Sequence, residues 1–224
     1  MPAWPTLRSI ITYTGLQAMY RRRLRHSRVK NLFKFASPKM NRVLTVESSL
    51  EFDVCFHFEY TSSISSYEAQ PEGFYYSFQG KQRPYTPDFL VIDKVYGSKF
   101  IEIKFYSELE DEEFREKFRC RQKSALDHGL PLLLVTDEKI RITPVLSNLK
   151  LLHRYSGLKS LTPLHLTMLD IVRKSGKVRV RDLAQETGQP SSLVLSSVIS
   201  WLAVGEINSD LSAAKLGVDS IVWC

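Results

Sequence analysis

The sequence has no long hydrophobic run and few cysteines. None of the apolar stretches in its 224 residues approaches the ~18 residues of a membrane span. The N-terminus lacks a short basic segment leading into an apolar core, so we expect no signal peptide. The three cysteines, Cys55, Cys120 and Cys224, are far apart. They argue against a disulfide framework and a zinc site, and they fit a reducing cytoplasm.

Acidic residues are absent from the first 46 positions. Residues 1–46 contain ten Lys or Arg, whereas the rest of the chain has 21 basic and 24 acidic residues. The formal net charge of +7 is therefore a property of the N-terminal segment. We predict a basic arm at residues 1–46 that contacts DNA phosphates; the alternative is a solvated tail. The predicted DNA-binding side chains are Arg21, Arg22, Arg23, Arg25, Arg28 and Lys30.

Two short apolar segments, residues 85–93 and 100–105, predict β-strands joined by a turn. A hairpin of these strands would bring Asp88 close to Glu102. Glu102 and Lys104 are two residues apart, so both would project from one face. Two carboxylates suit a hard cation that activates water, and a lysine can stabilise the developing negative charge. The alternative is two solvated strand faces.

The surrounding segments predict an α/β domain at residues 47–157. Strands are expected at 64–70, 73–78 and 132–136, and helices at about 108–128 and 145–155. Residues 48–60 fit both a strand and a helix, because their apolar side chains satisfy either period. The fold class that we predict is a mixed central sheet flanked by helices.

Residues 158–224 have the element order of a winged helix-turn-helix domain. Helices are expected at 164–174, 181–187 and 191–204, a short strand at 178–180, and wing strands at 206–207 and 220–223. The helix at 191–204 has no Lys, Arg, Asn or Gln for base contacts. We therefore predict that it docks onto a protein partner, through an exposed second apolar stripe at Leu195 and Ile199. The alternative is that the wing or the α/β domain at residues 47–157 covers this stripe.

Several motifs in one order resemble TnsA, the endonuclease subunit of heteromeric Tns-type transposases in the PD-(D/E)xK restriction-endonuclease-like superfamily. The resemblance covers residues from about 45 to 160. It rests on Ser49-Leu50-Glu51, Phe58-Glu59-Tyr60, Tyr67-Glu68-Ala69-Gln70-Pro71, Tyr85-Thr86-Pro87-Asp88-Phe89, Ile101-Glu102-Ile103-Lys104, Lys123, Gly129-Leu130-Pro131 and Val135-Thr136-Asp137.

The resemblance implies that residues 48–60 are a helix whose glutamate joins the strand carboxylates. Glu51 matches the motif, with Glu47 and Glu59 as weaker alternatives. Glu51, Asp88 and Glu102 would then bind Mg²⁺ or Mn²⁺, and Lys104 would complete the catalytic set. Some TnsA proteins have Gln at the position of Glu102. The glutamate in this chain restores the general nuclease pattern.

The activity that the resemblance implies is hydrolysis of the 5′ strands at transposon ends during cut-and-paste transposition. The implied partners are transposon-end DNA, the RNase-H-like transposase subunit TnsB and the AAA+ ATPase regulator TnsC, in the bacterial cytoplasm and at the nucleoid. The alternatives are a stand-alone restriction or repair nuclease and a DNA-binding scaffold with a degenerate nuclease core.

Overall fold

The computed structural model describes residues 31–157 and 162–224. The six basic side chains predicted to bind DNA, from Arg21 to Lys30, lie outside the described residues. Within the described part of the chain, no helix combines the length and the apolar character needed to cross a membrane.

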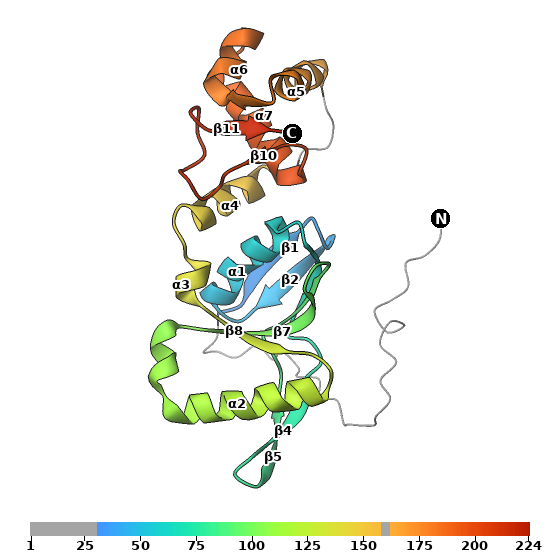
Figure 1. Ribbon diagram of the computed structural model, residues 1–224, viewed down its shortest axis with the longest axis vertical. Coiled ribbons are helices and arrows are strands. Elements are labelled where there is room, and N and C mark those ends of the chain that lie inside the picture. Colours follow the sequence, from blue (N-terminus) through green and yellow to red (C-terminus); the bar gives the residue numbers. More distant parts are fainter. Residues whose placement is uncertain (1–30, 158–161) are drawn as a thin grey trace, which may run out of the picture.

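A four-stranded mixed sheet forms the centre of the first body (Figure 1). Its strands are β3 (Ile64–Ala69), β6 (Phe89–Asp93), β7 (Gly97–Lys104) and β8 (Leu132–Thr136), in that order. β3, β6 and β7 pair antiparallel, and β8 runs parallel to β7. Side chains alternate along β7, so that Ile101 and Ile103 face one side and Phe100 and Glu102 face the other. The predicted hairpin is confirmed for β6 and β7, but the predicted strand at 85–93 begins only at Phe89, because Tyr85 ends the preceding strand.

Helices cover the two faces of this sheet. α1 (Ser49–Tyr60) packs on the face of Ile101 and Ile103, and α4 (Val145–Arg154) lies outside it. α2 (Glu112–Asp127) covers the face of Phe100, together with the hairpin of β4 (Phe74–Phe78) and β5 (Lys81–Tyr85). A 3₁₀ helix η2 (Tyr106–Glu110) and the short α3 (Asp137–Ile140) complete the body. This mixed sheet flanked by helices agrees with the predicted fold class and with a restriction-endonuclease-like fold.

The ambiguous segment 48–60 is a helix that is buried on most of its circumference. Its buried residues include Glu51, Asp53 and Glu59 beside Val54, Phe56 and Phe58. Ser48 caps its N-terminus by accepting a hydrogen bond from the Glu51 backbone N–H at 3.0 Å. At the other end, the Lys39 Nζ donates to the backbone oxygens of Phe58, Thr61 and Ile64.

The predicted boundary at residue 46 is wrong. β1 (Phe33–Ser37) and β2 (Arg42–Val46) form an antiparallel hairpin on α1. Phe35 and Val46 are at most 1% exposed and belong to the same core as the sheet. Residues 33–46 are therefore part of the first body, because their alternating apolar side chains need the cover that α1 provides.

The second body contains α5 (Pro163–Ser175), α6 (Val180–Thr187) and α7 (Ser191–Val204) around its own core of Met168, Leu183 and Trp201. A small antiparallel sheet of β10 (Asn208–Ser209), β11 (Ile221–Trp223) and β9 (Lys177–Arg179) completes it. β10 lies two residues beyond the predicted strand at 206–207.

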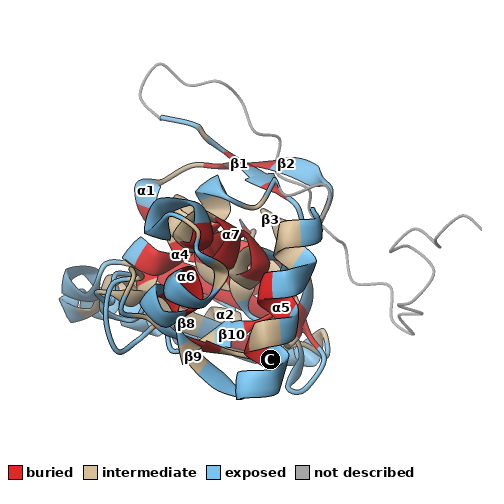
Figure 2. Ribbon diagram, turned by 90° about the horizontal axis from the view of Figure 1, so that it is seen from above, coloured by how far each residue is buried: buried red, intermediate tan, exposed pale blue. Residues whose placement is uncertain are grey.

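The expected exposed stripe on α7 is covered. Ile199 is 3% exposed and packs in the core of the first body, and Leu195 contacts both cores. α4 provides much of this cover, and the buried residues of α4 and α7 lie together near the centre of Figure 2. The prediction of a free stripe at Leu195 and Ile199 is therefore wrong, and its alternative, cover by the nuclease domain, is the correct one.

Candidate active site

A cavity of ≈960 Å³ opens where β6, β7, α2 and the start of α1 meet. All four residues that were predicted to be catalytic, Glu51, Asp88, Glu102 and Lys104, line it. Three separate segments of the chain, at the start of α1, just before β6 and on β7, thus bring these polar side chains to one place, which two solvated strand faces would not do.

Asp88 is held at the start of β6 by backbone hydrogen bonds. Its Oδ2 accepts from the Ile103 N–H at 2.7 Å, and its carbonyl oxygen accepts from the Gln70 N–H at 2.7 Å. Burial raises the pKa of the Asp88 carboxyl well above its usual value, and the charges of Glu102 and Glu51 raise it further. Glu102 and Glu51 are therefore close enough to Asp88 for their charges to disfavour its ionisation.

Glu102 is 4% exposed and projects toward α2. Its Oε2 accepts a hydrogen bond from the Tyr85 hydroxyl at 2.5 Å. Its Oε1 lies 3.8 Å from the Lys104 Nζ and 3.5 Å from a guanidinium nitrogen of Arg121. Burial raises the pKa of Tyr85, and the neighbouring Glu102 charge adds to the effect, so the tyrosine acts as a hydrogen-bond donor throughout the neutral range.

Glu51 lies in the first turn of α1 and completes its N-terminal cap. The Ser48 hydroxyl donates to the Glu51 Oε1 at 2.8 Å, and the Glu47 N–H donates to Oε2 at 3.1 Å. Burial raises the pKa of Glu51, although these hydrogen bonds oppose the shift. Glu47 also lines the cavity.

Glu59, the third candidate from α1, lies elsewhere. Its carboxylate accepts hydrogen bonds from the Ser37 and Tyr67 hydroxyls and from the Lys39 N–H, each at 2.6 Å. The structure thus retains Glu51 and Glu47 as helix candidates and assigns Glu59 to an internal network with the β1–β2 hairpin.

The donor set fits a hard divalent cation in its chemistry, because three carboxylates face one cavity and repel each other electrostatically. In the arrangement shown, no three His, Cys, Asp or Glu side chains among the described residues are grouped closely enough to hold a metal ion. Each carboxylate has a protein partner instead. A cation held by all three carboxylates would need them closer together than they stand here.

Sequence reasoning missed Arg121, which reaches the cavity from α2. Its guanidinium lies 4.4 Å from the centre of the Tyr85 ring and near Glu102. Nothing in its local sequence indicates this position, since α2 carries basic side chains on several faces. Arg121 lies four residues, about one helical turn, from Lys117, which also lines the cavity.

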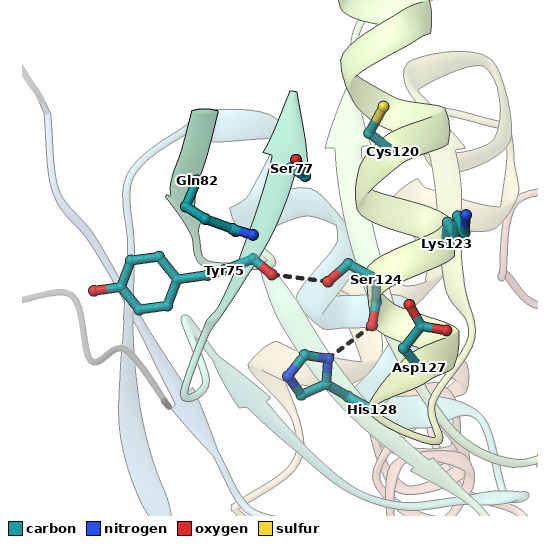
Figure 3. A pocket seen from close by; sticks show the side chains of 8 residues that line it. All are labelled: Tyr75, Ser77, Gln82, Cys120, Lys123, Ser124, Asp127 and His128. Carbon is teal, nitrogen blue, oxygen red and sulfur yellow. Dashed lines mark hydrogen bonds between the residues drawn. The ribbon is translucent and has the colours of Figure 1, made fainter. Parts of the chain in front are cut away.

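A second cavity of ≈640 Å³ lies between the β4–β5 hairpin and α2 (Figure 3). The Ser124 hydroxyl donates to the Tyr75 carbonyl oxygen at 2.8 Å across it. The His128 Nδ1 lies 2.7 Å from the Ser124 carbonyl oxygen, and its ring packs 5.1 Å from that of Phe74. His128 is thus a packing residue, and this cavity contains none of the predicted catalytic side chains.

Residues 61–137 match the family model described as TnsA-like endonuclease N terminal. A comparison with curated proteins finds no match. The matched segment runs from the end of α1 to the start of α3 and includes Asp88, Glu102 and Lys104, whereas Glu51 precedes it. The resemblance to TnsA-like endonucleases is confirmed over these residues.

Proposed function

We propose that this TnsA-like endonuclease is the nuclease subunit of a Tn7-type transposase, and that it hydrolyses the 5′ strand at each transposon end. One observation carries the proposal: Asp88, Glu102 and Lys104, which lie within the matched segment, face a single cavity with Glu51. The cofactor that suits this donor set is Mg²⁺, or Mn²⁺ in its place.

The chain's own residues have distinct roles in this proposal. Glu51, Asp88 and Glu102 would hold the cation, whose chemistry is to polarise the phosphate and to activate a water. Lys104 stands beside Glu102, where its positive charge can stabilise the negative charge that develops on the phosphate. The Ile103 N–H fixes Asp88, and Tyr85 fixes Glu102, so both act as positioning groups.

The organisation that we propose has three parts: residues 1–30 as a basic arm, residues 31–157 as the nuclease domain, and residues 158–224 as a winged helix. The order α5, β9, α6, α7, β10 and β11 supports the winged helix. DNA, the transposase subunit TnsB and the ATPase regulator TnsC are the proposed partners, since a nuclease of this type acts within a transposase. The absence of basic side chains on α7 argues against base contacts by this helix.

The test is strand-specific cleavage of a transposon-end duplex, labelled on either strand, with Mg²⁺ or Mn²⁺ and with or without the transposase partner. We expect Asp88→Asn to lose 5′-strand cleavage and to remain folded. Asp93→Asn is the matched control, because Asp93 ends the strand that Asp88 precedes, and it binds the Val95 and Tyr96 N–H groups outside the cavity.

Three results would change the proposal. Normal cleavage by folded Asp88→Asn would remove the catalytic assignment. Cleavage that needs no partner and no transposon end would indicate a stand-alone nuclease. DNA binding without cleavage under every condition would indicate a scaffold with an inactive nuclease core.

A further inference from the structure

One face of the β4–β5 hairpin is aromatic and packs against α2. Side chains alternate along both strands, so Phe74, Tyr76 and Phe78 share this face with Tyr85, and all four are at most 7% exposed. Arg83 is on the same face, because it pairs directly with Tyr76 across the hairpin. The hairpin projects from the sheet beside α2 in Figure 1.

Three cations stand on these rings, and we call Arg83, Lys117 and Arg121 the cation row. The Arg83 guanidinium and the Lys117 Nζ lie 5.3 Å and 5.6 Å from the centre of the Phe78 ring. The Arg121 guanidinium lies 4.4 Å from the Tyr85 ring centre and 5.3 Å from that of Tyr76. The rings thus support the cations through cation–π contacts, which leave N–H donors available to another ligand.

The cation row leads into the catalytic cavity. Lys117 and Arg121 are one helical turn apart on α2, and both line the cavity that contains Glu51, Asp88 and Glu102. Arg121 is the inner end of the row, 3.5 Å from Glu102. Arg83 is the outer end, and it forms no ion pair with the described residues.

The carboxylates of the cavity repel phosphate, and the cation row can offset this repulsion. Glu51, Asp88 and Glu102 line one cavity, and their negative charges repel an approaching phosphate. Cations next to the carboxylates counter this repulsion, since Lys and Arg that neutralise phosphates provide most of the attraction between a protein and DNA. Lys117 does have an acid partner, Glu113, but that side chain is 60% exposed and screened by solvent.

We propose that Arg83, Lys117 and Arg121 bind successive phosphates of the DNA strand that enters the catalytic cavity. This inference rests on the proposed function, because it assumes that DNA is the substrate of that cavity. Arg121 then holds the phosphate nearest the carboxylates, and Arg83 and Lys117 hold the strand that leads to it. The three residues of the row are not part of the basic N-terminal segment of the sequence.

The test is the salt dependence of DNA binding by the full chain. Fluorescence anisotropy of a labelled duplex, measured in EDTA to prevent cleavage, gives the slope of log affinity against log salt concentration. The slope is negative, and each lost phosphate contact makes it shallower by about 0.9. We therefore expect the double variant Arg83→Gln/Lys117→Gln to make it shallower by about 2. Arg121→Gln should make it shallower by about 1.

The matched control is the double variant Arg119→Gln/Lys123→Gln. It removes the same charge from exposed positions of α2 that do not line the catalytic cavity, so its slope should equal that of the parent. Equal slopes for the row variants and the parent, in a parent that binds and cuts DNA, would refute this inference alone. A parent that neither binds nor cuts duplex DNA would refute the proposed function and this inference with it.

Discussion

Asn148 joins the two bodies, and its removal should destabilise the whole chain. The side chain is on α4 and 1% exposed. Its Nδ2 donates to the carbonyl oxygens of Leu211 and Ala214 at 2.9 Å and 2.8 Å, and its Oδ1 accepts from the Leu216 N–H at 2.9 Å. One amide thus serves three backbone groups of the segment between β10 and β11.

The cost of Asn148→Ala follows from these three bonds. A buried group that loses its partner costs about 1–3 kcal/mol, so three backbone groups, some of which can recover water, amount to about 3 kcal/mol. In a chain of this length, each kcal/mol lowers Tm by about 2–4 °C. We therefore expect Tm to fall by about 6–12 °C.

Circular dichroism during thermal unfolding measures this change. Asn208→Ala is the control, because Asn208 is exposed on β10, and a surface substitution of this kind changes stability by about 0.5 kcal/mol or less. If Asn148→Ala unfolded within about 2 °C of the parent, the three bonds would not hold the bodies together, and this reasoning would be refuted.

Three further predictions concern the cavity and the N-terminus. Mg²⁺ at about 100 times its Kd should stabilise the parent by about 2.7 kcal/mol but leave the Tm of Asp88→Asn unchanged; equal shifts in differential scanning calorimetry would contradict the metal assignment. The folded-state pKa of Asp88 is raised above its ordinary value of 3.8. In the absence of metal, the contribution of Asp88 to the free energy of unfolding should therefore be lost as pH rises through the folded-state pKa, and urea titrations should show this loss in the parent but not in Asp88→Asn. Deleting residues 1–30 should reduce the salt slope of DNA binding with little change in Tm, whereas deleting 1–46 should also remove Phe35 and Val46 and unfold the protein; an unchanged slope would exclude the arm from DNA binding.

The strands that carry Asp88, Glu102 and Lys104 could be predicted because each has a clear local pattern. Apolar residues alternate or run continuously in residues 89–93 and 100–105, and the polar residues stand at fixed places within them. Strand pairing then follows from the short turn. The helix of Glu51 had no such pattern, because α1 buries acids and apolar residues around most of its circumference. Only the family resemblance indicated its helical state.

Features that depend on long-range packing could not be predicted. Arg121 reaches Glu102 only because the β4–β5 hairpin sets the position of α2, and the sequence around Arg121 contains no trace of that contact. The cover over Ile199 likewise depends on α4 of the other body. β5 was missed because Lys81–Tyr85 contains a proline and exposed polar residues, which is typical of an edge strand and weakens the strand pattern.

α1 also relates two glutamates that have different surroundings. Glu59 is fixed by Ser37, Tyr67 and the Lys39 backbone, eight residues and about 12 Å of helix from Glu51. Since each residue turns an α-helix by about 100°, the anchored end dictates the angle at which Glu51 enters the cavity. An insertion or deletion of one residue between them would rotate Glu51 by about that angle relative to the cavity. The length of this helix is therefore as much a part of the nuclease site as the carboxylates themselves.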